Sequence, residues 1–474
     1  MHKLLKRSLL FLGVLLGLVI LAALVAPMLV DANDFKPRIV AEVEEATGRK
    51  FAIEGDLELS VFPWLGVTVN GASLGNPAGF DDSVFASLER VDIRVRLLSL
   101  FSDRVEIAKV VLVGPTVRLS RHANGEDNWS DLAAGDGTGQ ESSSEPATKG
   151  PDFRVQGVLV ENAELRYSDA AAGVEFVMQA FNLDIDAISL PLDTSLSLNT
   201  EFELASSNIG GTAALATRLR ADPEGDAYGL DAGELELLLS GEAVPGNGEL
   251  PVSIRWERIE AGLKAEVAEI KSLTVEVLGM SPQLDMQVRN WSAALAYQGD
   301  AKLPSFTPQR AMAALDIEAP VTADDKVLND VAASFKFSGT AQRAALESLA
   351  IDLDDSNISG TLSVEDFERM ALRFDLVLDA IDADRYLPPA SDSPTGGDAS
   401  SEDVAIPVEM LRGLDVLGTL GIGKLTFMGI RSSDIEVGVD ARKDQLRLHP
   451  ARASLYEGSY SGDIRVDARR DTAR

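Results

Sequence analysis

The chain of 474 residues contains few side chains that could serve as catalysts or metal ligands. It has no cysteine, and its three histidines, His2, His122 and His449, lie far apart and outside any His-x-x-x-His pattern. Zinc is bound by thiolate sulfur and imidazole nitrogen, usually from residues at short, regular spacings. We therefore expect no metal site and no cofactor, and we interpret His122 and His449 as residues of surface turns.

A segment from Gly458 to Gly462, with the sequence GSYSG, has the glycine spacing of the turn that carries the nucleophile in α/β-hydrolases. That turn needs a serine at its centre and lies between a strand and a helix. Here the central residue is Tyr460, and the alternation places Tyr456 and Tyr460 on one apolar face with serines opposite. The pattern predicts a strand rather than a nucleophile.

Acidic residues occur close together at Asp184 and Asp186, at Asp324 and Asp325, and at Asp354 and Asp355. Neighbouring carboxylates can act as general acid and base. On an alternating strand, however, residues two apart share a face, so the first pair is expected on a solvated face. The two adjacent pairs fit turns, and none of the three has the ligand spacing of a calcium loop. These residues predict a protein that is not an enzyme.

The formal net charge is −32, from 75 acidic and 43 basic residues, and 45% of the residues are hydrophobic. Surfaces that bind nucleic acid carry basic patches, and anionic membrane surfaces attract Lys and Arg. The charge therefore argues against nucleic acid as a partner and against docking on an anionic membrane surface. We interpret the acidic excess as a solvated face that keeps a large β protein soluble.

The charge-free run from Leu9 to Val30 predicts a transmembrane anchor. A helix needs roughly 20 apolar residues to cross the hydrocarbon core of a bilayer. Basic residues precede the run and Asp31 follows it. The positive-inside tendency therefore places residues 1–8 in the cytoplasm and everything after Val30 on the far side of the membrane.

A cleaved signal peptide is the alternative interpretation of this run. Signal peptides have an apolar region of about 7–15 residues that ends in a small-x-small cleavage site. The run here is longer, and the best candidate site, at Ala26, is followed by Pro27, so we favour the anchor. Gly13 and Gly17 form a small-xxx-small pair that could pack against a second membrane helix.

The rest of the chain has mainly a hydrophobic period of two, which is typical of strands with one buried and one solvated face. Such strands form antiparallel rather than parallel sheets. A short helix is expected before them, from about Phe35 to Thr47, capped by Asn33 or Asp34. A second short helix is expected from Gln309 to Leu315, after Pro308.

A set of apolar residues on these strands would line one hydrophobic face: Leu57, Leu59, Val67, Val91, Ile93, Val95, Leu196, Leu198, Phe202, Leu372, Phe374, Leu376 and Leu378. A sheet must cover such a face by closing on itself, by pairing with a second layer, or by holding something apolar. From the alternation alone, the core of a closed β-sandwich is the simpler interpretation of these residues.

Two stretches contain almost nothing that could be buried, and they read as mobile linkers. The predicted order is a cytoplasmic tail (1–8), the anchor (9–30), an N-terminal β region with its leading helix (31–130), a disordered linker (131–152), a central β region (153–387), a disordered loop (388–405) and the start of a C-terminal β module (406–474).

Several segments resemble the AsmA family of envelope proteins. The resemblance is carried by ATGRKFAIEGDLELSVFPWLGVTVNGASLGNPAGF (Ala46 to Phe80), FASLERVDIRVRLLSL (Phe85 to Leu100), VEIAKVVLVGPTVRLSRHANGEDNWSDL (Val105 to Leu132), DSNISGTLSVEDFERMALRFDLVLDAIDADRYLPP (Asp355 to Pro389) and LYEGSYSGDIRVDAR (Leu455 to Arg469). Proteins of this family usually continue beyond the position of Arg474, so we expect a short member or a fragment.

The resemblance implies an inner-membrane protein with a periplasmic body, related to TamB-like bridge proteins. The implied fold is mainly β: a transmembrane helix followed by a long, curled antiparallel sheet that forms an open apolar β-groove, with a few short helices. The family is associated with outer-membrane assembly and with phospholipid movement across the periplasm. It offers no catalytic residues to transfer to this chain.

The resemblance and the anchor together favour an open groove over a closed sandwich. The leading hypothesis is an inner-membrane-anchored protein that binds or conducts phospholipids, with outer-membrane assembly components as possible further partners. A scaffold for outer-membrane β-barrel proteins, which would pair with them through exposed strand edges, is the alternative. A periplasmic hydrolase that uses Asp354 or Ser459 is a third hypothesis.

Overall fold

The computed structural model describes residues 31–60, 64–80, 82–96, 99, 104–133, 152–246, 248–389 and 413–467. The expected tail and anchor, with Gly13 and Gly17, lie outside these residues, as do most of the two expected linkers. Within the described part of the chain, no helix combines the length and the apolar character that a bilayer crossing requires. The anchor therefore stays a prediction.

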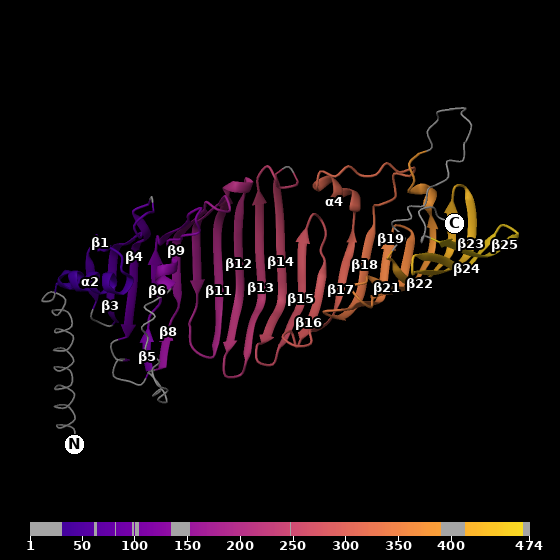
Figure 1. The fold of residues 1–474 in the computed structure, drawn as a ribbon. Helices are drawn as coiled ribbons and strands as arrows, with labels where there is room; N and C mark the ends of the chain where they lie inside the picture. The colour runs from indigo at the N-terminus through magenta and orange to yellow at the C-terminus, as the bar shows by residue number, and fades with distance from the viewer. Residues whose placement is uncertain are drawn as a thin grey trace, which may run out of the picture. The chain divides into compact units, whose positions relative to one another are not determined.

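The described residues are mainly β and form one large, mostly antiparallel sheet of twenty-five strands (Figure 1). The chain divides into two compact units, residues 1–223 with 233–244, and residues 224–232 with 245–474. Strand β13 (Ala227–Ser240) is divided between the two units, with residues 227–232 in the second and residues 233–240 in the first.

The first unit begins with a helical segment and continues with twelve strands. Its helical elements are η1 (Ala32–Phe35), α2 (Lys36–Thr47), α3 (Ser130–Ala133) and η3 (Ala205–Ser207). Its strands are β1 (Phe51–Ile53), β2 (Leu57–Ser60), β3 (Trp64–Gly75), β4 (Val84–Arg96), β5 (Arg104–Ile107), β6 (Val110–Val113), β7 (Thr116–Arg121), β8 (Asp152–Val155), β9 (Val158–Asp169), β10 (Val174–Ile185), β11 (Leu192–Leu204) and β12 (Ile209–Asp222).

The second unit carries the remaining strands and two short helical elements, α4 (Pro308–Ala314) and η4 (Ala383–Arg385). Its strands are β14 (Glu249–Gly262), β15 (Val267–Val277), β16 (Gln283–Arg289), β17 (Ala296–Phe306), β18 (Val331–Thr340), β19 (Ala344–Leu353), β20 (Ser356–Val364), β21 (Ala371–Asp382), β22 (Asp415–Phe427), β23 (Ile430–Arg442), β24 (Gln445–Leu455) and β25 (Gly458–Asp467).

Helix α2 confirms the helix expected before the strands. Pro37 occupies its first turn, where a missing backbone N–H costs nothing, and Gly48 ends it in the left-handed conformation at φ 67°. The expected cap by Asn33 or Asp34 is wrong. A turn of 3-10 helix precedes α2, and there the side chain of Asp31 accepts the N–H of Asn33 at 2.9 Å.

Helix α4 confirms the second expected helix, with Pro308 at its first position. Within this helix, the side chain of Ala311 is buried. The side-chain amide of Gln309 donates to the carbonyl of Val327 at 2.9 Å. The helix is thereby tied to the loop that leads into β18.

In the first unit, the alternation places apolar side chains of neighbouring strands directly opposite one another. In β11, every second side chain from Leu192 to Leu204 is at least half-buried, and those between are exposed. Pairing then aligns one apolar residue from each of eight strands in a single row: Leu57, Val69, Val91, Leu112, Val160, Leu183, Leu198 and Leu215. Opposite neighbours on one face lie about 5 Å apart, so the row is continuous.

The second unit has the same arrangement across its twelve strands. One row runs through Ile259, Ile270, Met286, Gly299, Phe337, Leu346, Leu362, Phe374, Gly418, Val439, Leu448 and Ile464. Ten of its twelve members carry large apolar side chains, and the two glycines lie beneath aromatic rings of the same face. Each unit therefore presents one apolar face.

The expectation of a purely antiparallel sheet is corrected at four pairings. Strand β21 pairs with β22 in parallel, β8 pairs in parallel with β5, and β9 pairs in parallel with both β6 and β7. Parallel neighbours need a crossover of a dozen or more residues, because the chain must return to the end from which it started. Residues 122–151 and 383–414 supply that length.

Several strands contain a β-bulge at a residue with positive φ that is not glycine. Asn162 of β9 and Ser272 of β15 have φ values of 54° and 53°, and the pairing register shifts beside them. The N–H of Asn162 donates to Asn182 Oδ1 at 2.9 Å, and that of Ser272 donates to Asp285 Oδ1 at 2.8 Å. Bulges bend a strand and increase its twist, and side chains of the next strand satisfy the N–H groups that the bulges leave unpaired.

Candidate functional site

In the described residues, the apolar faces of both units are lined with large side chains that stay partly exposed. In a packed core, such side chains lose nearly all contact with water. In the described residues, the largest side chains that are less than 2% exposed are Val327 and Asn128, and neither belongs to the apolar rows. Apart from Leu57, which is 5% exposed, the row residues with side chains are half-buried or exposed.

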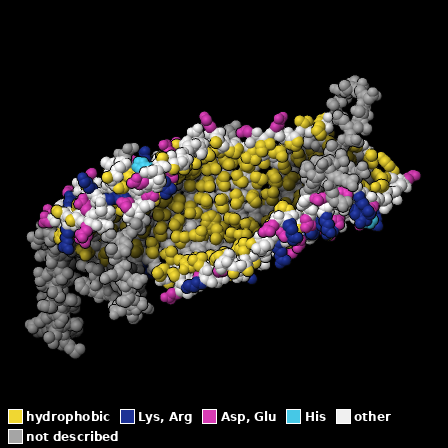
Figure 2. All heavy atoms as spheres, viewed as in Figure 1, with side chains coloured by type: hydrophobic (Ala, Val, Ile, Leu, Met, Phe, Trp, Pro, Cys, Tyr) yellow, Lys and Arg dark blue, Asp and Glu magenta, His cyan; other side chains and the backbone are white. Residues whose placement is uncertain are grey.

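Figure 2 shows how side chains are distributed over this surface. Hydrophobic side chains gather on the face of the strands that is turned toward the viewer, and Lys, Arg, Asp and Glu gather at its margins. The paired registers place the apolar rows on such faces within each unit. The apolar face is the surface whose composition most needs a functional explanation, because a large exposed apolar surface on a soluble body usually marks a binding site.

The structure places the expected lining residues on the apolar faces in two groups. In the first unit they are Leu57, Leu59, Val67, Val91, Ile93, Val95, Leu196, Leu198 and Phe202; in the second they are Leu372, Phe374, Leu376 and Leu378. Val67 and Ile93 lie opposite each other and are 37% and 47% exposed, whereas Leu378 is only 9% exposed. Their contact with a lipid stays a prediction.

The opposite face of the strands carries most of the charged side chains. Lys109 Nζ lies 2.6 Å from Asp184, which places Asp184 on a solvated face as expected. In the second unit, Arg255 and Glu276 lie 2.8 Å apart across β14 and β15. Exposed ion pairs of this kind contribute little to stability, so their main consequence is that this face stays wet.

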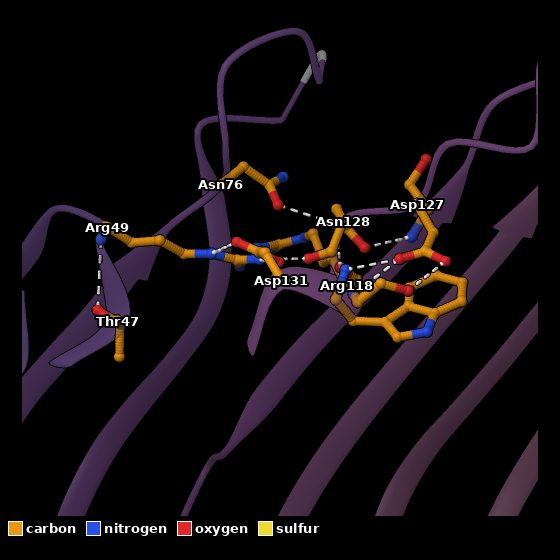
Figure 3. A network of polar contacts seen from close by, with 10 residues as sticks. Thr47, Arg49, Asn76, Arg118, Asp127, Asn128 and Asp131 are labelled. Carbon is orange, nitrogen blue, oxygen red and sulfur yellow. Dashed lines mark hydrogen bonds and ion pairs between the residues drawn. The ribbon is translucent and has the colours of Figure 1, made fainter. Parts of the chain in front are cut away.

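A polar cluster joins the end of α2 to the loop before α3 (Figure 3). The side chain of Arg49, which is 2% exposed, donates from Nε to Asp131 at 3.0 Å and from Nη2 to the carbonyl of Asn128 at 2.7 Å. Its guanidinium lies 4.5 Å from the ring centroid of Phe85 in β4. The hydrogen bond from Arg49 holds the pKa of Asp131 below its ordinary value, so this carboxylate is charged at neutral pH.

Asn128 is the centre of this cluster and is fully buried. Its Oδ1 accepts the N–H of Ser120 at 2.8 Å, and its Nδ2 donates to Asn76 Oδ1 and to the carbonyl of Arg118, each at 2.8 Å. One side chain therefore links the loop after β3, the strand β7 and the loop before α3. These contacts fix the N-terminal helix to the β body, which is a structural role.

A second polar cluster lies in the second unit, where β21 ends. Arg385 donates from Nε to Asp324 at 2.7 Å and from Nη1 to Asp355 at 2.8 Å. The hydroxyl of Tyr386 donates to Asp354 Oδ2 at 2.7 Å. Burial, followed by this hydrogen bond, raises the pKa of Tyr386 to about 12.

The carboxylate of Asp354 accepts several hydrogen bonds within this cluster. Burial raises the pKa of its carboxyl group, but hydrogen bonds from Tyr386 and from the N–H groups of Asn329, Leu328 and Asp330 outweigh burial, so the pKa lies below its ordinary value. Asp354 lies in a turn, and the other adjacent acidic pair lies in the bend and turn before β18, as predicted. This geometry holds loops together and presents no free acid or base at Asp354.

The remaining candidates for chemistry lie apart from one another. The ring of His122 lies 4.4 Å from that of Phe80 at the turn after β7, whereas His449 lies within β24 and not in the surface turn that was expected. Ser459 lies in β25, which confirms the expected strand, but Tyr456 lies in the preceding turn and not on the apolar face. Within the described ranges, no three His, Asp or Glu side chains are arranged to hold a metal ion.

Sequence reasoning missed the cluster around Asn128. A signal was present, because Asp127 precedes Ser130 by three residues, which is the spacing of a helix cap, and its Oδ1 accepts the Ser130 N–H at 2.8 Å. Arg49 and Asn76, the partners of Asn128, are distant from it in the sequence, so no local sequence pattern indicates these contacts. The burial of an asparagine follows only from the fold.

Comparison with known proteins gives the family. The AsmA family profile matches residues 1–474. The AsmA family protein YhjG of Escherichia coli (strain K12) is 26% identical over 190 residues, which cover 38% of this chain and 26% of YhjG. The aligned part thus spans about a quarter of that relative, and no solved structure matches the chain. On the strength of the profile match over its whole length, the chain belongs to the AsmA family.

Proposed function

We propose that the apolar face of each unit is a groove that holds the acyl chains of phospholipids. The protein would bind or conduct phospholipids without a catalytic step, anchored in the inner membrane by residues 9–30 with its body in the periplasm, and would support outer-membrane biogenesis. Membership of the AsmA family supports a role in the envelope that involves lipids.

The observation that carries the proposal is that the side chains of the apolar rows, apart from Leu57, remain partly exposed to solvent. Burying each methylene group of an acyl chain contributes about 0.8 kcal/mol. A two-tailed lipid therefore gains much free energy on such a face without a specific pocket. Because neighbouring strands present similar apolar side chains, a tail meets a similar environment at successive positions, which favours sliding.

A pair of substitutions on one strand tests the proposal. Leu376 of β21 lies on the apolar face, and Val377, its neighbour, lies on the opposite face and is 52% exposed. Leu376→Asp places a charge among the acyl chains, whereas Val377→Asp places the same charge in water. We expect full-length wild-type protein and V377D to retain phospholipid after purification in a nonionic detergent. L376D should lose most of the phospholipid that is bound to the second unit.

Lipid extraction and mass spectrometry measure the retained phospholipid, and urea unfolding shows that each variant is folded. Absence of phospholipid from the folded wild-type protein, together with failure to take up a fluorescent phospholipid, would overturn the proposal. Equal retention by L376D and V377D would also overturn it for this part of the sheet.

A scaffold for outer-membrane β-barrel proteins is a second candidate, favoured by one observation. In the described part of the chain, β25 pairs along one side only, with β24. An edge strand of this kind offers backbone groups to a client strand. Crosslinks from β25 to barrel proteins that persist in L376D would support a scaffold, and their loss in that variant would point back to lipid.

A further inference from the structure

The two edges of the apolar face in the second unit differ in charge. We call one of them the 316–384 rim: it comprises residues 316–330 before β18, the turn between β19 and β20, Asp382 at the end of β21, and residues 383–386 after it. It carries nine acidic residues: Asp316, Glu318, Asp324, Asp325, Asp330, Asp354, Asp355, Asp382 and Asp384. Its basic residues are Lys326 and Arg385.

These carboxylates begin where the apolar strands end. Val331 and Leu353 lie opposite each other at the ends of β18 and β19, on the apolar face. Asp330 directly precedes Val331, and Asp354 directly follows Leu353. An acyl chain that lies on this face therefore has carboxylates beside it at the rim.

Two carboxylates of the rim, those of Asp324 and Asp354, are held in their charged form. The pKa of Asp324 is held below its ordinary value by the N–H of Lys326 and by the Arg385 side chain, and hydrogen bonds lower that of Asp354. Arg385 is engaged with Asp324 and Asp355. Of the remaining acids, Glu318 and Asp325 are exposed to solvent.

The opposite edge of the same face has mixed charge. The turns between its strands carry almost equal numbers of the two charges, namely five acidic residues (Glu266, Glu365, Asp366, Glu368 and Asp444) and four basic ones (Lys264, Arg343, Arg369 and Lys443). Arg369 lies 2.7 Å from Asp366 between β20 and β21. Arg373 lies 2.8 Å from Asp415, where β21 and β22 begin. The excess of negative charge is therefore a property of the 316–384 rim.

We infer that the second unit discriminates phospholipids by headgroup charge, and that it takes zwitterionic phospholipids such as phosphatidylethanolamine in preference to anionic ones such as phosphatidylglycerol. This inference rests on the proposed groove. Acyl chains on the apolar face leave the headgroup at an edge, because a phosphate does not enter an apolar surface without a partner. A net negative headgroup is repelled by the rim, whereas an ammonium group is attracted to it.

The effect is electrostatic and therefore moderate and dependent on salt. The carboxylates act across water, where each pair of charges interacts weakly, and screening reduces interactions beyond about 8 Å at physiological ionic strength. With several uncompensated carboxylates, we expect about a threefold preference at low salt. The preference should shrink toward none at about 1 M salt, where the screening length is about 3 Å.

The test uses the full chain in mixed micelles with equimolar phosphatidylethanolamine and phosphatidylglycerol of identical acyl chains. The rim variant is E318K with D325K. The matched control is E269K with E347K, which makes the same change in charge on the polar faces of β15 and β19. The ratio of the two bound lipids, measured by mass spectrometry, is compared with the ratio supplied.

We expect the wild-type protein and the control to enrich phosphatidylethanolamine, and the rim variant to bind the two lipids nearly in the supplied ratio. Binding of both lipids by the wild-type protein without enrichment would overturn the inference and leave the groove intact. Equal loss of preference in both variants would also overturn it, because the effect would then come from net charge. Binding of neither lipid would instead refute the proposed function.

Discussion

The rings of Tyr297 and Phe337 lie 6.3 Å apart, and each covers the glycine opposite it on the neighbouring strand. Tyr297 of β17 lies over Gly339, and Phe337 of β18 lies over Gly299. A Cβ atom on Gly339 would lie 2.4 Å from the tyrosine ring, and one on Gly299 would lie 2.6 Å from the phenylalanine ring. At this point the apolar face therefore consists of two aromatic rings, each packed on the backbone of a glycine in the neighbouring strand.

This arrangement predicts that Gly299 does not tolerate alanine. The added Cβ would lie 2.1 Å from the carbonyl oxygen of Asp285 and would also collide with the Phe337 ring. We expect Gly299→Ala to lower the free energy of unfolding by about 1–3 kcal/mol, measured by urea unfolding. The control is Gly421→Ala in β22, where the nearest atom is a methyl carbon of Val377 at 3.7 Å. A similar loss in both variants would contradict the ring-over-glycine explanation.

The cluster around Asn128 predicts a large effect from a small substitution. Asn128→Ala would leave the N–H of Ser120 and the carbonyl of Arg118 without their buried partner. Each unsatisfied group costs about 1–3 kcal/mol, so we expect a loss of at least about 2 kcal/mol in the free energy of unfolding. This loss is measured by following unfolding through the fluorescence of the adjacent Trp129. Asn124→Ala in the exposed turn nearby should change stability by less than about 0.5 kcal/mol.

The hydrogen bond between Tyr386 and Asp354 predicts a dependence on alkaline pH. The pKa of Tyr386 is raised to about 12 in the folded chain, above the value of about 10 in an unfolded chain. Its contribution is fully present below pH 10 and is lost as the pH rises through 12. We expect Tyr386→Phe to cost about 1 kcal/mol at pH 8, and the difference from the wild-type protein to vanish near pH 12. A constant difference across this range would rule out the assigned ionisation.

The apolar row of the first unit predicts a crosslinking pattern that depends on the face. Leu198 and Ser197 are neighbours in β11, and their side chains point to opposite faces of the sheet. A photoreactive amino acid at position 198 should crosslink to phospholipid in living cells, and the same group at position 197 should give only background. Mass spectrometry of the adducts identifies the lipid. Equal crosslinking at the two positions would show that the apolar face has no special access to lipid.

Much of the fold follows from local pattern. The period of two gave the correct faces for residues such as Leu57, Leu198 and Phe374, because each strand has one wet and one apolar side regardless of what it pairs with. The two short helices followed from their proline and glycine signals. The parallel pairing of β21 with β22 could not be foreseen, because it depends on where the chain returns after residues 383–414 and not on either strand.

The details of the candidate surface were harder to predict than its existence. Alternation cannot say whether Val67 and Ile93 face a second layer or open space, since both environments select apolar side chains. The bulges at Asn162 and Ser272 could not be predicted from a glycine, because neither residue is one. Their positive φ is stabilised by hydrogen bonds to side chains of the next strand. Such relationships depend on which residues of two paired strands lie opposite one another, and the pattern of either strand alone does not show it.

From β14 to β25, each strand pairs with the next one in the sequence, and this has a consequence for evolution. In a globular core, an inserted segment disturbs packing in three dimensions, but a ladder of hairpins grows along a single direction. A duplicated hairpin in the second unit would lengthen the apolar surface by two strands and leave the registers on either side unchanged. Length can therefore vary among proteins built in this way without a new fold having to arise.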